Sequence, residues 1–341
     1  MKKALALLLA LMMLLSLSAC GGSTDGAAEA ATPAVAEETQ PQEAEPTADP
    51  SAVQVGEKML LRGDQQYSLH RYDQAFEYYS QAAELGNVEA VHAVGMMYRN
   101  GEGVAQDYGK ALEYFTRAAE AGNTDAICAV GDMYYSGHGV EQDYDKAMEY
   151  FSRAAEAGNA RGLCSVGSMY YNGYSVDQDY EKALEYFSRA AEAGNTDAMY
   201  LAGSMYYVGS GIEQNHARAL EYFTQAAEAG DANAMYMAGL LHEAGTDIEQ
   251  DYTKALVYYT RAAEAGHADA MLSVAAFYDL GLGVERDFSK ALEYYTRSAE
   301  AGNAEAMHTL GIIYQLGKGV EADSAKAQEY YDKAAAAGYV D

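Results

Sequence analysis

The feature that most constrains this chain is an internal repeat of 36 residues. A glycine recurs at that spacing, at positions 86, 122, 158, 194, 230, 266, 302 and 338. Seven full copies occupy residues 88–339, and a shorter unit precedes them at 56–87. A period of roughly 20 to 50 residues is typical of solenoids, propellers and other arrays whose units pack against their neighbours.

Each copy contains two helix-like segments and lacks the alternation of a strand. In the copy 124–159, the first segment, DAICAVGDMYYS, is followed by the glycine-rich turn GHGVEQ. Asp143 then stands where a helix N-cap belongs. The second segment ends at Gly158, whose freedom to adopt a positive φ suits a helix C-terminus. The units are therefore predicted to be helix pairs.

The copies resemble the Sel-one-like repeat, a relative of the tetratricopeptide repeat. In the copy 124–159 the matching residues are Ala126, Gly131, Tyr134, Gly137, Gly139, Val140, Asp143, Ala147, Tyr150, Phe151, Ala154, Ala155 and Gly158. A tryptophan common in that family near the Tyr150 position is replaced here by tyrosine. Residues 56–87 resemble a tetratricopeptide-type first repeat. The resemblance implies an all-α fold, a right-handed α/α solenoid (superhelix) of stacked two-helix repeats.

The N-terminus has the layout of an export signal. Residues 1–19 combine two lysines, a short apolar run and small residues, and the run is too short for a convincing membrane span. The end of this segment, LSAC, resembles the lipobox of bacterial lipoproteins, which implies a lipid on Cys20. An ordinary signal peptide with an incidental cysteine is the alternative. Residues 20–55 hold all four prolines and seven acids without Lys or Arg, so we expect a disordered tether.

The charge of the chain restricts its partners. It carries 51 Asp and Glu against 22 Lys and Arg, for a formal net charge of −29. Such a surface argues against nucleic acid and against anionic lipid as partners. The export signal and the lipobox resemblance imply that the protein is extracytoplasmic, and together with this charge we expect it to contact a bacterial membrane through its N-terminal lipid only. High charge also promotes solubility, so it does not by itself identify a partner.

Function is expected where the repeats differ, because positions that recur in every copy must serve packing. Counting each copy from its first residue, positions 5, 9 and 12 vary most and share one face of the first helix. We call these residues the variable stripe. In the tetratricopeptide relatives the corresponding stripe lines a concave groove that binds partners. The predicted partner-binding residues are His92, Arg99, Asp132, Tyr135, Ser168, Tyr171, Tyr200, Ser204, Tyr207, Tyr236, Glu243 and Asp279.

Tyrosine dominates the middle of this stripe. Its ring offers a large contact area at a small entropic cost, and its hydroxyl group can orient a partner. The four charged residues, Arg99, Asp132, Glu243 and Asp279, are predicted to set specificity. The alternative is that some of the rings only pack against the neighbouring repeat.

No pattern in the sequence indicates catalysis, a metal or a cofactor. His92, Cys128 and Cys164 occupy position 5 of adjacent copies, and stacked helices lie roughly 8–10 Å apart. That spacing is too wide for common metal ligands, a Cys–His dyad or a disulfide. We therefore expect Cys128 and Cys164 to be reduced thiols, with a disulfide between them as the alternative. The Gly-x-Gly turns lack the strand and third glycine of a phosphate-binding loop.

These observations favour a membrane-anchored adaptor without enzymatic activity, which binds a protein or peptide of the cell envelope in its groove. A receptor for a small ligand such as a cell-wall glycopeptide is a second hypothesis, because tyrosine rings also stack on sugars. A β-lactam-binding or hydrolysing enzyme is a remote third, since some secreted members of the family have been linked to that chemistry. No Ser-x-x-Lys motif occurs in this chain.

Overall fold

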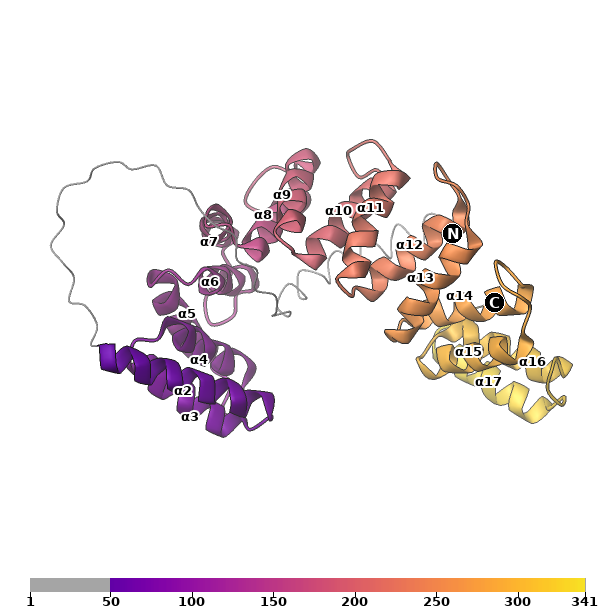
Figure 1. Ribbon diagram of the computed structural model, residues 1–341, viewed down its shortest axis with the longest axis horizontal. Helices are drawn as coiled ribbons and strands as arrows, with labels where there is room; N and C mark the ends of the chain where they lie inside the picture. Colours follow the sequence, from indigo (N-terminus) through magenta and orange to yellow (C-terminus); the bar gives the residue numbers. More distant parts are fainter. Residues whose placement is uncertain (1–49, 341) are drawn as a thin grey trace. The chain divides into compact units, whose positions relative to one another are not determined.

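The computed structural model describes residues 50–340, and within that range it contains sixteen helices and no strand (Figure 1). The first repeat consists of α2 (Pro50–Ser68) and α3 (Tyr72–Glu84). The later first helices are α4 (Val88–Asn100), α6 (Thr124–Ser136), α8 (Ala160–Asn172), α10 (Thr196–Val208), α12 (Ala232–Ala244), α14 (Ala268–Leu280) and α16 (Ala304–Leu316). The later second helices are α5 (Tyr108–Glu120), α7 (Tyr144–Glu156), α9 (Tyr180–Glu192), α11 (His216–Glu228), α13 (Tyr252–Glu264), α15 (Phe288–Glu300) and α17 (Ser324–Ala336).

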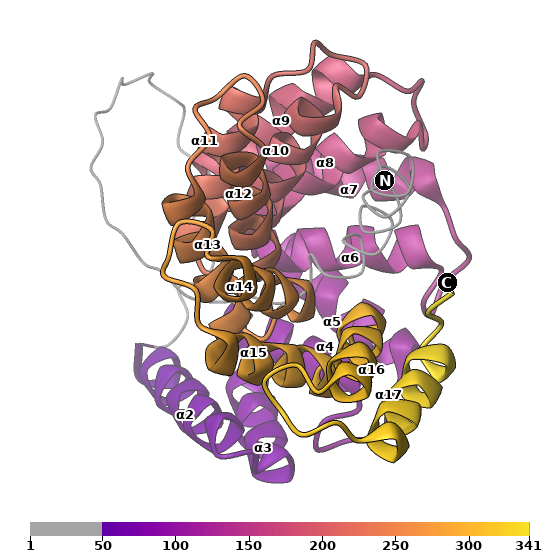
Figure 2. The same cartoon turned by 90° about the vertical axis from the view of Figure 1, so that its right-hand side faces the viewer.

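The described residues divide into two compact units, 50–193 and 194–340. In each unit the two helices of a repeat pack against each other, and the second helix packs against the first helix of the next repeat (Figures 1 and 2). The predicted all-α solenoid of stacked helix pairs is thus confirmed. None of the helices between residues 50 and 340 is long and apolar enough to cross a membrane.

The N-terminal boundary differs from the prediction. The predicted tether extends to residue 55, whereas α2 already begins at Pro50. Proline suits the first turn of a helix because its ring presets φ and its missing N–H would have no intrahelical partner. The predicted signal peptide, Cys20 and the rest of the tether lie outside the described residues.

The helix ends use the caps that the sequence predicts. The Asp143 carboxylate accepts a hydrogen bond from the Lys146 backbone N–H at 3.0 Å, which satisfies a free donor at the start of α7. At the other end, Gly158 adopts a φ of 78° and donates its N–H to the Ala155 carbonyl at 3.0 Å. Asn159 then caps α8, because its side chain accepts from the Gly162 N–H. Each repeat thereby ends one helix and starts the next within a few residues.

A buried ring packed against a glycine joins the two helices of a repeat. Phe151 of α7 is 2% exposed and lies on Gly131 of α6, where a Cβ atom would come within 2.6 Å of the ring. The same contact joins Gly95 to Phe115, Gly167 to Phe187, Gly203 to Phe223, Gly239 to Tyr259 and Gly311 to Tyr331. The recurring alanines of the second helix, such as Ala147 and Ala154, are fully buried beside it. These recurring positions are therefore packing positions, as predicted.

A second repeated contact joins the same helices through stacked tyrosines. Tyr134 of α6 stacks on Tyr150 of α7 with ring centroids 5.8 Å apart. Lys146 lies 5.0 Å from the Tyr134 centroid, and Arg153 lies 5.2 Å from that of Tyr150. A cation over a tyrosine face is attracted by the negative charge density of the ring. Most other repeats have this arrangement, so it occupies most of the recurring lysines and arginines.

Substitution of Gly131 by alanine is expected to lower the free energy of unfolding by about 1–3 kcal/mol, because the Phe151 ring must move away from α6. The matched control is Gly109→Ala, near the start of α5, where a Cβ atom has only Asp107 Oδ1 nearby, at 3.4 Å. This control is expected to be neutral or stabilising, because alanine favours the helix. Urea titration followed by circular dichroism measures both changes, and equal midpoints for the two variants would contradict the packing role of Gly131.

Candidate partner-binding surface

The variable stripe is divided between the two units. In residues 50–193 it includes His92 and Arg99 on α4, Asp132 and Tyr135 on α6, and Ser168 and Tyr171 on α8. In residues 194–340 it includes Tyr200, Ser204 and Tyr207 on α10, Tyr236 and Glu243 on α12, and Asp279 on α14. Since these residues occupy equal positions on successive first helices, each unit carries its own part of the stripe.

Four of the twelve predicted residues are buried. Ser204 is 0% exposed, Ser168 5%, Tyr200 8% and Asp279 9%. In this conformation they cannot present their side chains to a partner, so variation at these positions reflects local packing. The other eight residues are partly exposed.

Glu243 and Asp279 are predicted to set specificity, but in this structure both bind residues of their own unit. The Tyr259 hydroxyl donates a hydrogen bond to Glu243. Asp279 accepts one from Lys318 Nζ at 2.6 Å and pairs with Arg286 at 3.5 Å. These two carboxylates are therefore occupied by internal partners.

The type of residue at position 12 depends on which aromatic residue packs on the glycine. Where that residue is tyrosine in the full copies, position 12 is Glu243, Asp279 or Gln315, and Tyr331 donates to Gln315 at 2.7 Å. In the first repeat, Tyr79 donates to Asp64 at 2.8 Å, from a different position of the first helix. Where it is phenylalanine, position 12 is Arg99, Tyr135, Tyr171 or Tyr207. A buried hydroxyl must find an acceptor, and this requirement explains Glu243 without a binding partner. Asp279 is explained instead by its pairing with Lys318 and Arg286.

This pairing makes a stability prediction. Tyr259→Phe is expected to lower the free energy of unfolding by about 1–2 kcal/mol, because the half-buried Glu243 loses its donor. The double variant Tyr259→Phe with Glu243→Tyr recreates the combination of Phe151 with Tyr135 and is expected to recover most of the loss. Chemical unfolding of the wild type and the single and double variants provides the comparison. Additive losses in the double variant would show that the two positions are independent.

A polar cluster joins α4, α6 and α8 in residues 50–193. Arg161 at the start of α8 donates to Asp132 Oδ2 at 3.2 Å and to the Asp125 carbonyl at 3.4 Å. Arg99 faces the same aspartate, since the positive charges of Arg161 and Arg99 both oppose the rise that desolvation causes in the pKa of Asp132. Sequence reasoning did not select Arg161. A signal was present, because the other full copies have Glu, Asp or Asn at this position.

Burial alters the titration of the neighbours of this cluster. It lowers the pKa of His92 to about 4 from its ordinary value of 6.5 and raises the pKa of the Cys128 thiol to about 12. Cys128 and Cys164 are both 0% exposed, and neither forms a disulfide. The Cys128 thiol instead donates to Asn159 Oδ1 at 3.2 Å. At neutral pH His92 is therefore uncharged and Cys128 is an unreactive thiol.

The exposed tyrosines of the first unit are held by neighbouring rings. Tyr135 contacts Tyr144 and Tyr174 with centroids 5.4 and 6.0 Å apart, and Tyr144 stacks on Tyr174 at 4.7 Å. Tyr171 packs edge-on against Tyr180 at 5.2 Å. The two rings are half-buried, so part of each remains accessible. Such rings lose little entropy when a partner binds, because their positions are already restricted.

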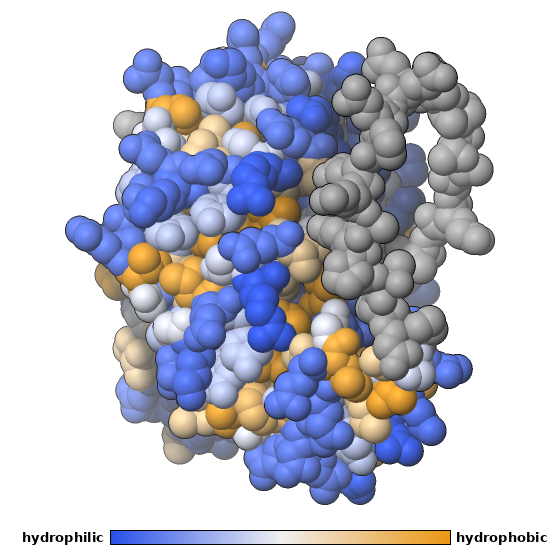
Figure 3. Space-filling view, turned by 90° about the vertical axis from the view of Figure 1, so that its left-hand side faces the viewer, coloured by the Kyte–Doolittle hydropathy of each residue, from blue (hydrophilic) through white to orange (hydrophobic). Residues whose placement is uncertain are grey.

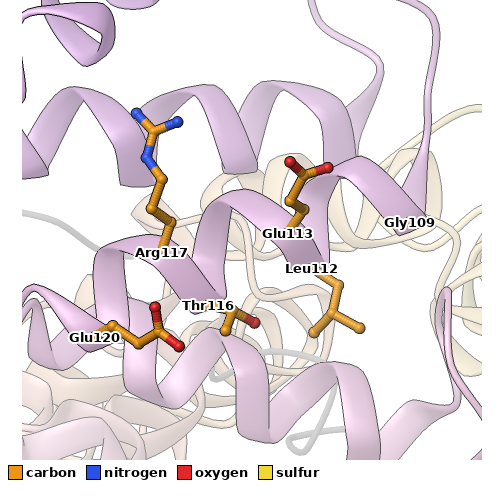
Figure 4. A pocket seen from close by; sticks show the side chains of 6 residues that line it. All are labelled: Gly109, Leu112, Glu113, Thr116, Arg117 and Glu120. Carbon is orange, nitrogen blue, oxygen red and sulfur yellow. The ribbon is translucent and has the colours of Figure 1, made fainter.

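The surface is mixed in polarity and carries a depression on α5. On the face drawn in Figure 3, apolar residues form separate patches between hydrophilic side chains. A depression of about 500 Å³ lies on α5 and is lined by Gly109, Leu112, Glu113, Thr116, Arg117 and Glu120 (Figure 4). Its charged residues recur at the same positions in other repeats, and Arg117 is held by the Ala83 carbonyl at 2.9 Å. Within residues 50–340, no group of His, Cys, Asp and Glu is arranged to hold a metal ion.

Comparison with known families identifies the repeat. The model of the Sel1 repeat matches residues 50–87, 88–123, 124–159, 160–195, 196–231, 232–267, 268–303 and 304–339. The chain belongs to the Sel1 repeat family. The match includes residues 50–87, so the unit predicted at 56–87 as a tetratricopeptide-type repeat is a Sel1 repeat that begins at residue 50. Sel1 repeat solenoids are suited to protein–protein interaction, and their scaffolds are generally not enzymes.

Two solved structures of Sel1 repeat proteins are similar to this one. The first is c5321, a protective antigen of uropathogenic Escherichia coli, with 33% sequence identity over 83% of this chain and a TM-score of 0.70. This chain spans 62% of the length of that antigen. The second, a Sel1 repeat protein from Oxalobacter formigenes, has 30% identity over 71% of this chain and 99% of its own, with a TM-score of 0.63. A search of curated proteins found no match.

Proposed function

We propose that this Sel1 repeat protein is an adaptor without enzymatic activity, which holds a protein or peptide partner on its variable stripe. The observation that carries the proposal is the pair Tyr135 and Tyr171. The packing residues recur in every copy, whereas these two rings stand at a position where one further copy has Tyr207 and the others have Arg, Glu, Asp or Gln. They are also partly exposed and held in place by other rings.

The physical basis of binding is the covering of these rings by the partner. A tyrosine ring contributes a large apolar area and a hydroxyl that can orient a partner, and its place is already restricted before binding. Asp132 forms an ion pair with Arg161, so it adds no unpaired negative charge beside Tyr135. The stripe in residues 50–193 therefore combines aromatic contact area with little electrostatic repulsion toward a peptide.

The variant with Tyr135→Ala and Tyr171→Ala is expected to lose at least tenfold in affinity for the partner and to keep the helical content of the wild type. The experiment uses the mature chain as bait for cross-linked cell-envelope extract and measures the affinity of any enriched protein. The matched control is Glu149→Ala with Glu185→Ala, which changes exposed residues of the second helices in the same two copies. A partner bound equally by all three baits would contradict the assignment to these tyrosines.

The same baits test the second candidate function. The stacked rings of Tyr144 and Tyr174, 4.7 Å apart and 5° from parallel, offer an aromatic surface beside Tyr135 on which a sugar could lie. Saturable binding of soluble cell-wall fragments that is lost in the double tyrosine variant would favour a glycopeptide receptor over the adaptor.

We propose further that the protein is attached to the outer side of a bacterial membrane by a lipid on Cys20, and that its partner belongs to the cell envelope. The support is the sequence LSAC at residues 17–20, behind two lysines and an apolar run. Lipid chains give membrane affinity at about 0.8 kcal/mol for each buried methylene, so a lipid with several chains is a stable anchor.

Cys20→Ser is expected to abolish incorporation of a labelled fatty acid and to release the protein from the membrane fraction. Cys164→Ser, which changes a fully buried thiol, is the control and is expected to retain both label and location. Equal labelling of wild type and Cys20→Ser would contradict lipidation at this residue. Gel fluorescence after metabolic labelling, with fractionation of the same cells, provides the measurement.

A further inference from the structure

From the charges on the variable stripe we infer that the partner presents a carboxylate to Arg99. The inference rests on the proposed function, because it names the chemistry that a bound peptide must bring to the stripe. The carboxylate belongs to an acidic side chain of the partner or to its C-terminus, and both have the geometry that a guanidinium group binds well.

The first support is the absence of an ion pair at Arg99. Of the charged residues predicted on the stripe, Asp132 pairs with Arg161, Asp279 pairs with Lys318, and Glu243 accepts from Tyr259. Among residues 50–340, Arg99 forms no ion pair, and its side chain donates a weak hydrogen bond from Nε to Asn100 Oδ1 at 3.4 Å. Its charge is therefore available to an incoming group.

The second support is the surroundings of that charge. Arg99 is half-buried, and burial lowers the pKa of its guanidinium, which shows that the charged form is poorly solvated there. A poorly solvated charge without a close partner is unfavourable, and an anion that binds it removes this cost. Arg99 thus favours an anionic partner over a neutral one.

The third support is the charge balance of the cluster. Asp132 pairs with Arg161 at 3.2 Å and also faces Arg99, so one carboxylate is shared by two guanidinium groups. The Asp125 carboxylate accepts from Asn159 at 2.8 Å. In addition, Arg161 Nε is buried and makes no hydrogen bond within the described residues. The site has two guanidinium groups around one aspartate, in a chain whose net charge is −29. A carboxylate is therefore attracted here although the protein as a whole repels it.

The spacing of the repeats predicts where the rest of the peptide lies. Arg99, Tyr135 and Tyr171 occupy position 12 of three successive copies, whose first helices are roughly 10 Å apart. An extended chain advances about 3.3 Å per residue, so roughly three residues separate neighbouring contacts. The expected peptide has an acidic residue followed or preceded, about three and six residues away, by residues that cover tyrosine rings.

The test selects random twelve-residue peptides displayed on phage against the mature chain and then measures selected peptides by fluorescence anisotropy. We expect Asp or Glu to be enriched at one peptide position. Arg99→Gln is expected to weaken these peptides roughly tenfold, whereas it should not affect their Gln or Asn analogues. The matched control is Arg153→Gln, because Arg153 lies over the Tyr150 ring on a second helix. Arg99→Glu is expected to select peptides with Lys or Arg instead.

Each other outcome overturns a defined part of the inference. Peptides that need Tyr135 and Tyr171 but show no acidic preference would refute the role of Arg99 and leave the proposed adaptor function intact. Peptides that bind the Arg99 variant and the double tyrosine variant as tightly as they bind the wild type would refute both. The chain has its own acidic segment, residues 21–49. A synthetic peptide of that segment that competes as strongly as the selected peptides would identify an intramolecular occupant and refute the partner assignment.

Discussion

The contact between a ring and a glycine is the constraint on which the rest of each unit depends. Phe151 can approach the backbone of α6 only because Gly131 has no side chain, and the same geometry recurs in most of the repeats. It brings the two helices close together and buries the Phe151 ring, which is 2% exposed. The neighbouring alanines are small for the same reason, since a longer side chain would separate the helices. One helix pair repeated with this contact is sufficient to build a solenoid.

The choice of ring in this contact has consequences on the surface. A phenylalanine has no hydroxyl that needs an acceptor, so position 12 does not have to supply one. In these copies it is Arg99, Tyr135, Tyr171 or Tyr207. A tyrosine brings a buried hydroxyl, which requires an acceptor such as Glu243 or Gln315 on the first helix. Variation along the stripe therefore has two sources. At position 12 in residues 50–193, where the ring is phenylalanine, no acceptor is required, whereas around Tyr259 the residue at this position is a condition of packing.

The lysines and arginines of the chain also divide into a group that serves packing and a group that does not. Most of the recurring lysines and arginines lie over tyrosine rings, as Lys146 and Arg153 do, and thereby stabilise the helix pairs. Arg99 and Arg161 stand outside this pattern, on the first helices of the unit 50–193. In so acidic a protein, two arginines around one aspartate form a local region of opposite charge. The proposed binding of an acidic peptide follows from this exception to the repeat.

The sequence alone determined the period, the helix pairs, the caps at Asp143 and Gly158, and the packing role of the recurring residues. Each of these depends on residues close in the chain or on the repeat itself. The tertiary structure decided which variable residues are accessible. Ser204 is buried, Glu243 meets Tyr259 sixteen residues away, and Asp132 meets Arg161 twenty-nine residues away. Such contacts depend on how far a side chain reaches across packed helices, and periodicity does not contain that information.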